Sequence, residues 1–386
     1  MSISSQSSHL ILYVGLDVHK ETVVIAVLPA GAEKPTRVDR VPNDPKTLRR
    51  YFARLAEEGD IRACYEASGA GYVLQRAMQA WGYACEVIAP SLIPQQPGHR
   101  RKHDRYDARQ LARYYRNGEL TPVRIPTEAE ERVRDLVRCR TTFQRELLRA
   151  RHYVLKFLTR RGVRYTAGKC HWTRAHQAWL GQLPRTGVLV AEDATVFGEY
   201  LALLQYAQQR RDALDDEIEH LALTPTLASA VGRLACFRGI NTVAAVTLAT
   251  EMVDWRRFGK PTQLMAYLGL VPCEDSSDGT ERRFAITKAG NSHCRHVLVQ
   301  AAWAYRHAPA VGTALRGRQR GQPPEVITHA WKAQHRLHKL YHHLAYRKGP
   351  QVAVVAVARE LVGFLWAAMQ ACPVTETSTS STKNAA

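Results

Sequence analysis

The sequence predicts an α/β domain of about 125 residues, then a pair of long helices, then a mainly helical domain. Three observations support this order. Short β-rich runs alternate with segments of helical spacing over the first third of the chain, which is typical of an α/β domain. Residues 128–161 contain neither proline nor glycine, which favours one long helix. Beyond residue 231, several helical segments surround one polar loop.

The first domain is expected over residues 10–125, after a Ser-rich segment, residues 1–9, that is expected to be disordered. It begins with two β-rich runs, LILYVGLDV and VVIAVL, around a short polar turn, which predicts a β-hairpin. Alternating apolar runs and helical spacing predict the elements that follow. Strands are expected over 61–67 and 85–89, and helices over 45–58, 71–81 and 104–117.

Two long helices, 128–161 and 192–223, are expected to form an antiparallel coiled-coil arm or a bundle within a region spanning 126–230. The segment between them is expected to be irregular. A third domain is expected over 231–372, and the Ser/Thr-rich tail 373–386 is expected to be disordered. In this third domain a polar loop is predicted from Cys273 to Thr287, among helices over about 291–307, 324–348 and 352–371.

The charge of the chain indicates nucleic acid as its partner. Lys and Arg number 54 against 35 Asp and Glu, giving a net charge of +19. Residues 95–170 hold 20 basic and 8 acidic side chains, and residues 255–348 hold 16 and 5. Two basic blocks around an acidic middle suggest two regions that contact a polyanion.

Other classes of protein are disfavoured. The eight cysteines form no CxxC pair, so a zinc finger and a disulfide scaffold are not expected, and a reducing cytoplasm fits. No N-terminal stretch has the basic, apolar and small-residue order of a secretory signal, so secretion is not expected. The apolar stretch 352–369 is interrupted by Arg359 and Glu360, so we expect a buried helix and no membrane span.

Four acidic residues stand out in the first domain. Asp17 interrupts an apolar strand, where a carboxylate is costly unless it is solvated, paired or bound to metal. Glu66 ends another strand, and the spacing of Asp104 and Asp107 places both on one helix face. Carboxylates from these elements could converge to bind Mg²⁺, which prefers oxygen ligands. A strand-end turn, a helix cap and surface ion pairs are the alternatives for the individual residues.

A serine pair lies in the third domain, in PCEDSSDGTERRFAITK. A serine hydroxyl can attack a phosphodiester when it is deprotonated and cations neutralise the phosphoryl oxygens. The candidate cations are Arg282, Arg283, Lys288 and Arg295. A plain Ser/Asp/Gly hairpin loop is the alternative interpretation.

Basic residues form a row on the helix that starts at Asp104. Their spacing of i, i+4, i+8 and i+11 would let one helix face follow phosphates, and interleaved tyrosines could stack on unpaired bases. The row is Arg105, Arg109, Arg113 and Arg116. A solvated helix face is the alternative.

The combination of these motifs resembles a known family. The runs GLDVHK, YEASG, KHDRYDARQLA and GLVPCEDSSDGTERRFAITKAGNSHCRHVLVQAAWAY carry the resemblance. The first domain resembles the RuvC-like, RNase H-type nuclease fold. From about residue 12 to about residue 347 the chain resembles the DEDD transposases of bacterial insertion sequences, a family that includes the Piv-type invertases and the bridge-RNA-guided recombinases.

This resemblance implies a set of catalytic residues. The four family acids fall on Asp17, Glu66, Asp104 and Asp107, which would hold Mg²⁺. A serine near the glycine of SSDG would form a covalent link to DNA. Because family members often read SSG or SG here, Asp278 leaves the register open, and we choose Ser277 with Ser276 as the alternative.

The resemblance also implies partners and a place of action. Donor DNA, target DNA and a structured bridge RNA would bind, and the acids of one subunit would serve the serine of another in a dimer that assembles to a tetramer. The protein would act at the nucleoid in the bacterial cytoplasm. Two other functions remain open from the residues: a RuvC-like nuclease that hydrolyses DNA with water, and a nucleic-acid-binding scaffold without catalysis.

Overall fold

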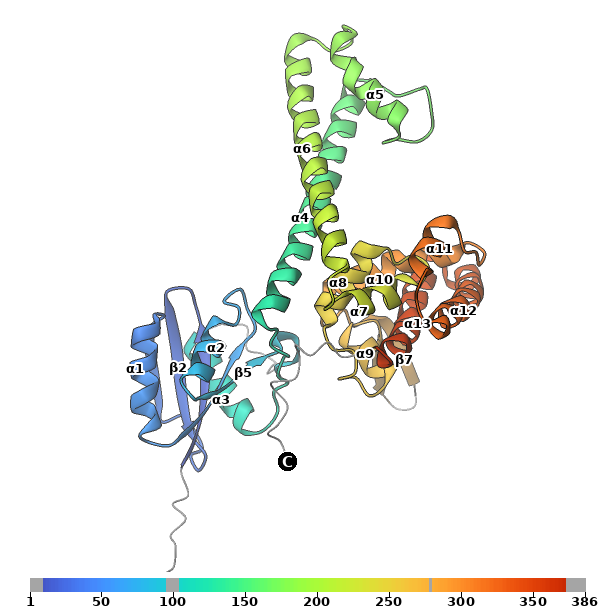
Figure 1. Ribbon diagram of the computed structural model, residues 1–386. Coiled ribbons are helices and arrows are strands. Elements are labelled where there is room, and N and C mark those ends of the chain that lie inside the picture. Colours follow the sequence, from blue (N-terminus) through green and yellow to red (C-terminus); the bar gives the residue numbers. More distant parts are fainter. Residues whose placement is uncertain (1–9, 95–103, 278–279, 373–386) are drawn as a thin grey trace, which may run out of the picture. The chain divides into compact units, whose positions relative to one another are not determined.

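The computed structural model describes residues 10–94, 104–277 and 280–372, and the side chains of 104–106 and 274–284 also lie outside the description. The predictions of disorder for residues 1–9 and 373–386 concern residues outside these ranges. The chain divides into two compact units, residues 1–127 and 128–386. Figure 1 shows the first unit in blue to cyan and the second in green to red.

The first unit is built on a five-stranded sheet of order β3-β2-β1-β4-β5. β2 pairs antiparallel with β1 and β3, whereas β4 pairs parallel with β1 and β5. Among the described residues, three α-helices accompany the sheet, with a 3-10 turn over Pro90–Leu92. The elements are β1 (Ile11–Val18), β2 (Thr22–Pro29), β3 (Arg37–Pro42), α1 (Pro45–Ala56), β4 (Asp60–Glu66), α2 (Val73–Ala80), β5 (Ala84–Ile88) and α3 (Asp104–Arg116).

Helices cover both faces of this sheet. Leu12, Val14 and Leu16 of β1 pack in one cluster with Phe52 of α1 and Met78 of α2. The opposite face packs against α3, whose buried residues lie against β2 and β4. The clusters on that side include Val24, Ala26, Cys64, Ile88, Ala108, Leu111 and Ala112. Alternate residues of each strand therefore serve different helices, as the twofold side-chain period of a strand requires.

The predicted α/β domain is confirmed, with one strand that was not predicted. β3 has the sequence RVDRVP, and none of its residues is fully buried. An edge strand with charged residues and a terminal proline lacks the apolar alternation by which strands are recognised. The hairpin, the two further strands and the three helices lie within two residues of their predicted limits.

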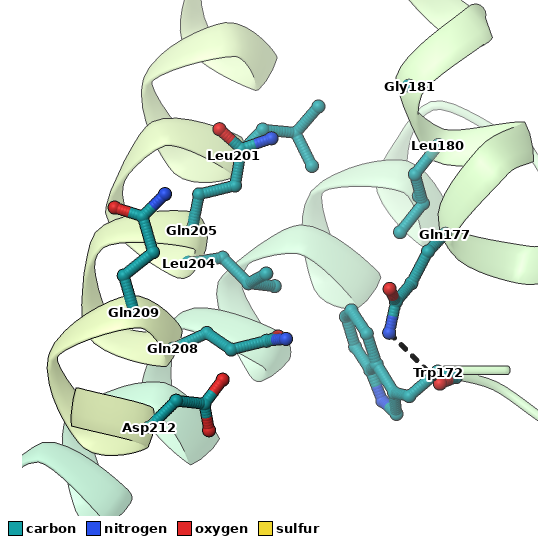
Figure 2. A pocket seen from close by; sticks show the side chains of 10 residues that line it. All are labelled: Trp172, Gln177, Leu180, Gly181, Leu201, Leu204, Gln205, Gln208, Gln209 and Asp212. Carbon is teal, nitrogen blue, oxygen red and sulfur yellow. Dashed lines mark hydrogen bonds between the residues drawn. The ribbon is translucent and has the colours of Figure 1, made fainter. Parts of the chain in front are cut away.

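The second unit begins with an antiparallel pair of long helices, α4 (Glu128–Arg160) and α6 (Ala191–Ala222). Arg161 pairs with Asp193 at one end, and Arg140 pairs with Asp215 further along, which fixes the antiparallel register. The segment expected to be irregular contains a further helix, α5 (Arg174–Gln182), followed by a 3-10 turn over Leu183–Arg185. α5 lies beside α6 and leaves a groove between them (Figure 2).

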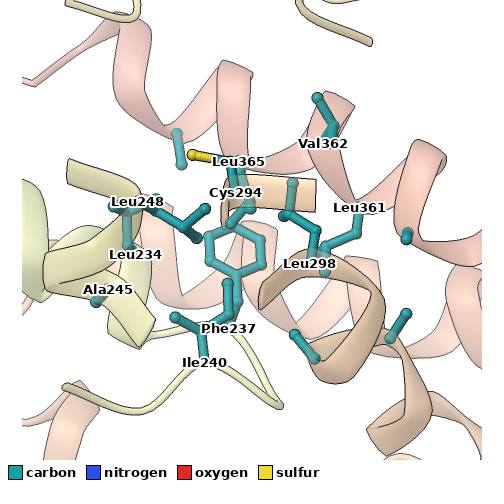
Figure 3. Close-up of a cluster of buried hydrophobic side chains, with 14 of the residues drawn as sticks. Leu234, Phe237, Ile240, Ala245, Leu248, Cys294, Leu298, Leu361, Val362 and Leu365 are labelled. Carbon is teal, nitrogen blue, oxygen red and sulfur yellow. The ribbon is translucent and has the colours of Figure 1, made fainter. Parts of the chain in front are cut away.

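The remainder of the second unit is mainly helical, as predicted. Its core gathers around Phe237, which is fully buried among Leu234, Leu248, Leu298 and Leu365 (Figure 3). Six further helices and a 3-10 turn beside α10 surround this core, together with α13. They are α7 (Ala228–Ala235), α8 (Thr242–Met252), α9 (Pro261–Tyr267), α10 (Ser292–Ala302), Trp303–Arg306, α11 (Thr313–Gln319), α12 (Pro324–Lys348) and α13 (Pro350–Gln370).

The last helix, α13, is long and apolar enough to cross a membrane by length and composition. Nine of its residues, among them Val357, Leu361 and Leu365, are buried in the core of the second unit. A core helix passes the same test as a membrane span, and these contacts agree with the predicted buried helix.

Candidate active site

Two of the four predicted acids occupy neighbouring positions in the sheet. Leu16 of β1 is the register partner of Tyr65 of β4, so Asp17 and Glu66 come next on two adjacent parallel strands. Adjacent strands lie about 4.8 Å apart. Asp17 is also opposite Val24 of β2, and Glu66 is opposite Ile88 of β5. Because Val24 and Ile88 both pack toward α3, both acids lie on the sheet face that α3 covers.

The course of α3 brings its first turn toward these acids. Tyr115, near the end of α3, stacks edge-on against Tyr13 with ring centroids 5.9 Å apart. Gly15, two residues further along β1, lies against the middle of the helix, where an added Cβ would be 2.1 Å from the Ala108 carbonyl oxygen. The helix therefore runs antiparallel to β1. Toward the C-terminal end of β1, the next residue on this face after Gly15 is Asp17. Toward the N-terminal end of α3, the helix reaches its first turn, which carries Asp104 and Asp107.

The carboxylate of Asp17 is partly enclosed. Its side chain is 22% exposed, and its Oδ2 lies 3.1 Å from Nε2 of His19 in a hydrogen bond. Glu66 is exposed and Asp107 is half-buried. Among the residues whose side chains are described, no group of three His, Cys, Asp or Glu is close enough to hold a metal ion. The side chain of Asp104 is not among them.

The prediction of a polar loop over residues 273–287 is wrong, because the chain forms a β-hairpin there. β6 (Pro272–Ser277) pairs antiparallel with β7 (Thr280–Ile286). Ser277 is the partner of Thr280, and Ser276 is the partner of Glu281, so both serines lie at the end of the hairpin next to its turn. The strands consist largely of Glu, Asp, Ser and Arg, which are poor strand formers, and the sequence therefore reads as a loop.

Backbone contacts fix the base of this hairpin. Gly269, Lys288 and Gly290 all have positive φ angles, and Lys288 N–H donates to the Gly269 carbonyl at 3.1 Å. A side chain at position 290 would collide with the Tyr267 carbonyl oxygen, so only glycine fits at this position. Lys288 is exposed just below the strands.

Arg295, which sequence reasoning assigned to phosphate binding, is engaged with the backbone. Its Nη1 donates to the carbonyls of Leu268 at 2.9 Å and Ala289 at 2.7 Å. Burial lowers the pKa of Arg295 from its usual value. The guanidinium thus ties α10 to the two chain segments at the base of the hairpin. The side chains of Arg282 and Arg283 lie outside the described residues.

The similarity of this chain to known proteins shows which family it belongs to. A model of DEDD transposases of the IS110 group matches residues 14–161, and a model described as "Transposase IS116/IS110/IS902 family" matches residues 232–315. The chain is 40% identical over 363 residues to the y4qE protein of Sinorhizobium fredii, whose name describes a candidate transposase. That alignment covers 92% of this chain and 87% of the relative.

The chain belongs to the IS110/IS116 family of transposases. A second relative, the transposase for insertion sequence element IS1533 of Leptospira borgpetersenii, is 30% identical over 342 residues, covering 86% of this chain and 96% of the relative. The predicted transposase function and insertion-sequence origin are therefore confirmed.

The predicted basic row on α3 of this transposase divides into two parts. Arg109 and Arg113 are exposed on the helix surface. Arg116 instead donates to the Ala32 carbonyl and so holds the turn between β2 and β3. Tyr115 packs against Tyr13, and it therefore contributes to the core of the first unit. The side chain of Arg105 lies outside the described residues.

Sequence reasoning missed one buried ionic cluster in the transposase. Glu251 of α8 is 1% exposed and accepts hydrogen bonds from Arg138 Nε and Nη2 at 2.8 and 3.0 Å. Asn291, the N-cap of α10, donates to the same carboxylate at 2.7 Å, and Arg134 lies 3.7 Å away. The only sequence signal is a lone Glu in the apolar run VAAVTLATEM. This cluster joins α4 and α8 to the segment that follows the serine hairpin.

A second feature that the sequence did not indicate is a cation near the base of the hairpin β6–β7. The Arg257 guanidinium sits 4.7 Å from the ring centroids of both Phe258 and Tyr267. Tyr267 is 37% exposed and immediately precedes the segment that enters β6. The two rings also contact each other, with centroids 5.2 Å apart, and the cation–π contacts of the guanidinium with both rings help to fix its position.

Proposed function

We propose that this transposase cuts and rejoins DNA through a serine hydroxyl in the hairpin β6–β7, assisted by Mg²⁺ at Asp17, Glu66, Asp104 and Asp107. The reaction would be guided by a structured bridge RNA. The observation that carries the proposal is the placement of Asp17 and Glu66 on one sheet face, under the first turn of α3. The strand order, with β2 antiparallel and β4 parallel to central β1, supports a RuvC-like, RNase H-type fold.

The types of donor suit a hard divalent cation, but the described carboxylates of Asp17, Glu66 and Asp107 are not close enough together to form a site of three ligands. With Asp104, they would have to converge when the ion binds. Oxygen ligands of this kind suit Mg²⁺. When bound, the ion would neutralise phosphoryl charge and favour the ionised form of an attacking hydroxyl. His19 would orient the Asp17 carboxylate through its hydrogen bond.

The serine supplies the chemistry that conserves the phosphodiester bond energy. Its Oγ would lose its proton and attack phosphorus, so that a P–Oγ bond forms and the bond from phosphorus to the leaving strand breaks, and the released oxygen of that strand would take up a proton. Ser277 is the residue we choose, because it is the last strand position before the turn and is next to Asp278 and Gly279. Ser276 is the alternative. Lys288, Arg282 and Arg283 would provide positive charge for the phosphoryl oxygens.

The two catalytic parts lie in different units of the chain: the acids precede residue 127, and the serines follow residue 128. We propose that a dimer, assembling to a tetramer at the nucleoid, brings the acids of one subunit to the serine of another. Exposed Arg109 and Arg113, with the basic blocks of the sequence, would contact donor DNA, target DNA and RNA phosphates.

Trapping of the covalent intermediate tests this function. Wild-type protein with labelled suicide DNA should give an adduct that survives a denaturing gel, and Asp17→Asn should give none while melting normally. Ser277→Ala should bind nucleic acid and form no adduct, whereas Ser229→Ala, at a serine on α7 in the same unit, should behave as wild type.

Each other outcome has a defined meaning. An adduct that persists in Ser277→Ala and disappears in Ser276→Ala assigns the nucleophile to Ser276. Cleavage that survives both substitutions refutes the serine mechanism and favours hydrolysis by water. Full activity of Asp17→Asn refutes the metal site.

A further inference from the structure

A groove of about 210 Å³ lies between α5 and the middle of α6 (Figure 2). Leu180 and Leu204, which are 3% and 7% exposed, form its buried floor. Trp172 lines one side, and glutamine side chains line much of the rest. The glutamines are Gln177, Gln205, Gln208 and Gln209.

The amides come mainly from one stripe of α6. Leu201, Leu204, Gln205, Gln208 and Asp212 recur at helical spacing on the face that lines the groove. The stripe is apolar at Leu201 and Leu204 and polar from Gln205 onward. A primary amide carries a carbonyl acceptor and two N–H donors on one plane. Such groups match the hydrogen-bonding edge of a nucleobase, and the amide of glutamine can bind adenine with its donor and its acceptor at once.

Trp172 is held as a rigid platform at this groove. Its backbone N–H donates to Nδ1 of His176 at 3.1 Å, and its carbonyl accepts from Nε2 of Gln177 at 3.1 Å. The His176 ring packs edge-on against the indole, with centroids 5.2 Å apart. Gln208 points across the opening toward Trp172 (Figure 2). An indole fixed in this way offers a flat surface on which a base can stack.

Positive charge adjoins the platform. The Arg151 guanidinium carbon lies 5.1 Å from the centroid of the Trp172 ring, and Arg151 Nε is buried with no hydrogen-bond partner among the described residues. Burial and then the nearby Arg211 lower the pKa of Arg151. Arg151 as a whole is only half-buried, so the accessible part of its guanidinium places positive charge beside the indole, which suits an anionic oxygen such as that of a phosphate.

From these contacts we propose that the groove binds one unpaired nucleobase, stacked on Trp172 with its edge facing the glutamine row and its phosphate toward Arg151. This inference rests on the proposed nucleic-acid function and adds a subsite to it. Amides for the edge, an aromatic plane for the face and a guanidinium for the phosphate together match a nucleotide.

The test uses full-length protein and three fluorescent 12-mers: oligo(A) RNA, oligo(A) DNA and an abasic strand of equal charge. Gln208→Leu preserves the size of the side chain and removes its amide. We expect Gln208→Leu and Trp172→Leu each to weaken oligo(A) binding about tenfold, since a bidentate amide–adenine contact and base–aromatic stacking each contribute on that scale. Trp172→Phe should lose less. Tyr206→Ala, which removes a 57% exposed aromatic outside the groove lining, is the matched control.

The loss should be absent with the abasic strand, because that strand offers phosphates without bases. The RNA and DNA probes distinguish the source of the base. A 5-iodouracil-containing strand should also photocrosslink to the tryptic peptide that contains Trp172. Unchanged oligo(A) affinity in Gln208→Leu and Trp172→Leu, with no crosslink at Trp172, would overturn the proposal and leave the transposase function standing. If the wild type binds none of the strands, the proposed nucleic-acid function itself fails.

Discussion

Replacing Glu251 with alanine should destabilise the second unit strongly, because one buried carboxylate connects three helices. Glu251 is 1% exposed and accepts from Arg138 at 2.8 Å and from Asn291 at 2.7 Å. Removal of one partner from a buried pair costs about 3–5 kcal/mol. Arg138 is 43% exposed, so water screens part of the attraction, and we expect the lower end, about 3 kcal/mol.

Urea unfolding followed by tryptophan fluorescence measures this loss. Six of the seven tryptophans follow residue 128, so the signal reports mainly on the second unit. Glu146→Ala is the control, since Glu146 pairs with Arg149 on the helix surface, and such exposed pairs contribute about 0–1 kcal/mol. If Glu251→Ala unfolds within about 0.5 kcal/mol of Glu146→Ala, the reasoning from burial is refuted.

The same carboxylate predicts a dependence on pH. Burial acts to raise the pKa of Glu251, but hydrogen bonds and charge from Arg138, with help from Asn291 and Arg134, outweigh it and lower the pKa below its usual value. An acid of this kind stabilises the fold above its unfolded pKa of about 4.3 and loses that contribution as pH falls through its folded pKa. Wild type should therefore lose more stability than Glu251→Gln on acidification below about pH 5. Parallel losses in both proteins would contradict the assignment.

Further expectations concern the two units and their binding. Gly15→Ala should force α3 away from β1, because the new Cβ would lie 2.1 Å from the Ala108 carbonyl oxygen. We expect this variant to lose about 1–3 kcal/mol of stability in thermal or urea unfolding and to cleave no DNA. Gly31→Ala, with open space around the new Cβ, should change neither stability nor cleavage. Asn291→Ala should cost about 1 kcal/mol in unfolding from the lost N-cap of α10, and more from Glu251. Nucleic-acid affinity, measured by anisotropy, should fall at least tenfold between about 50 and 200 mM salt.

The regular elements of the fold were predictable because their patterns are strong. α4 was expected at 128–161 and lies at Glu128–Arg160, since a long run without helix breakers leaves few alternatives. α5 was missed because nine residues between two irregular segments give too little periodicity to recognise. The strands β6 and β7 were not predicted, because their charged composition opposes a strand conformation and the segment was expected to be a polar loop, with a hairpin loop as the alternative.

The candidate site was predictable by residue and only partly by geometry. The position of Asp17 in an apolar strand singled it out, and its partner Glu66 followed from a second strand end. Their common sheet face depends on the parallel pairing of β1 with β4, which joins residues 49 positions apart in the sequence, as in the pair Leu16 and Tyr65. The hydrogen bonds of Arg116 and Arg295 to backbone carbonyls could not be predicted, because the sequence does not show which group a basic side chain will contact after folding.

The division of the chain at residue 127 has a consequence for its synthesis. Every hydrophobic cluster of the described residues draws its members from one unit alone. The N-terminal unit can therefore fold on the ribosome once Val123 and Ile125 have emerged and packed on its sheet. At about 5–20 residues per second, Ser277 is translated roughly 8–30 s after residue 127. During that interval a nascent chain carries the acidic residues without the proposed nucleophile, so a chain that ends before Ser277 holds only one half of the proposed reaction.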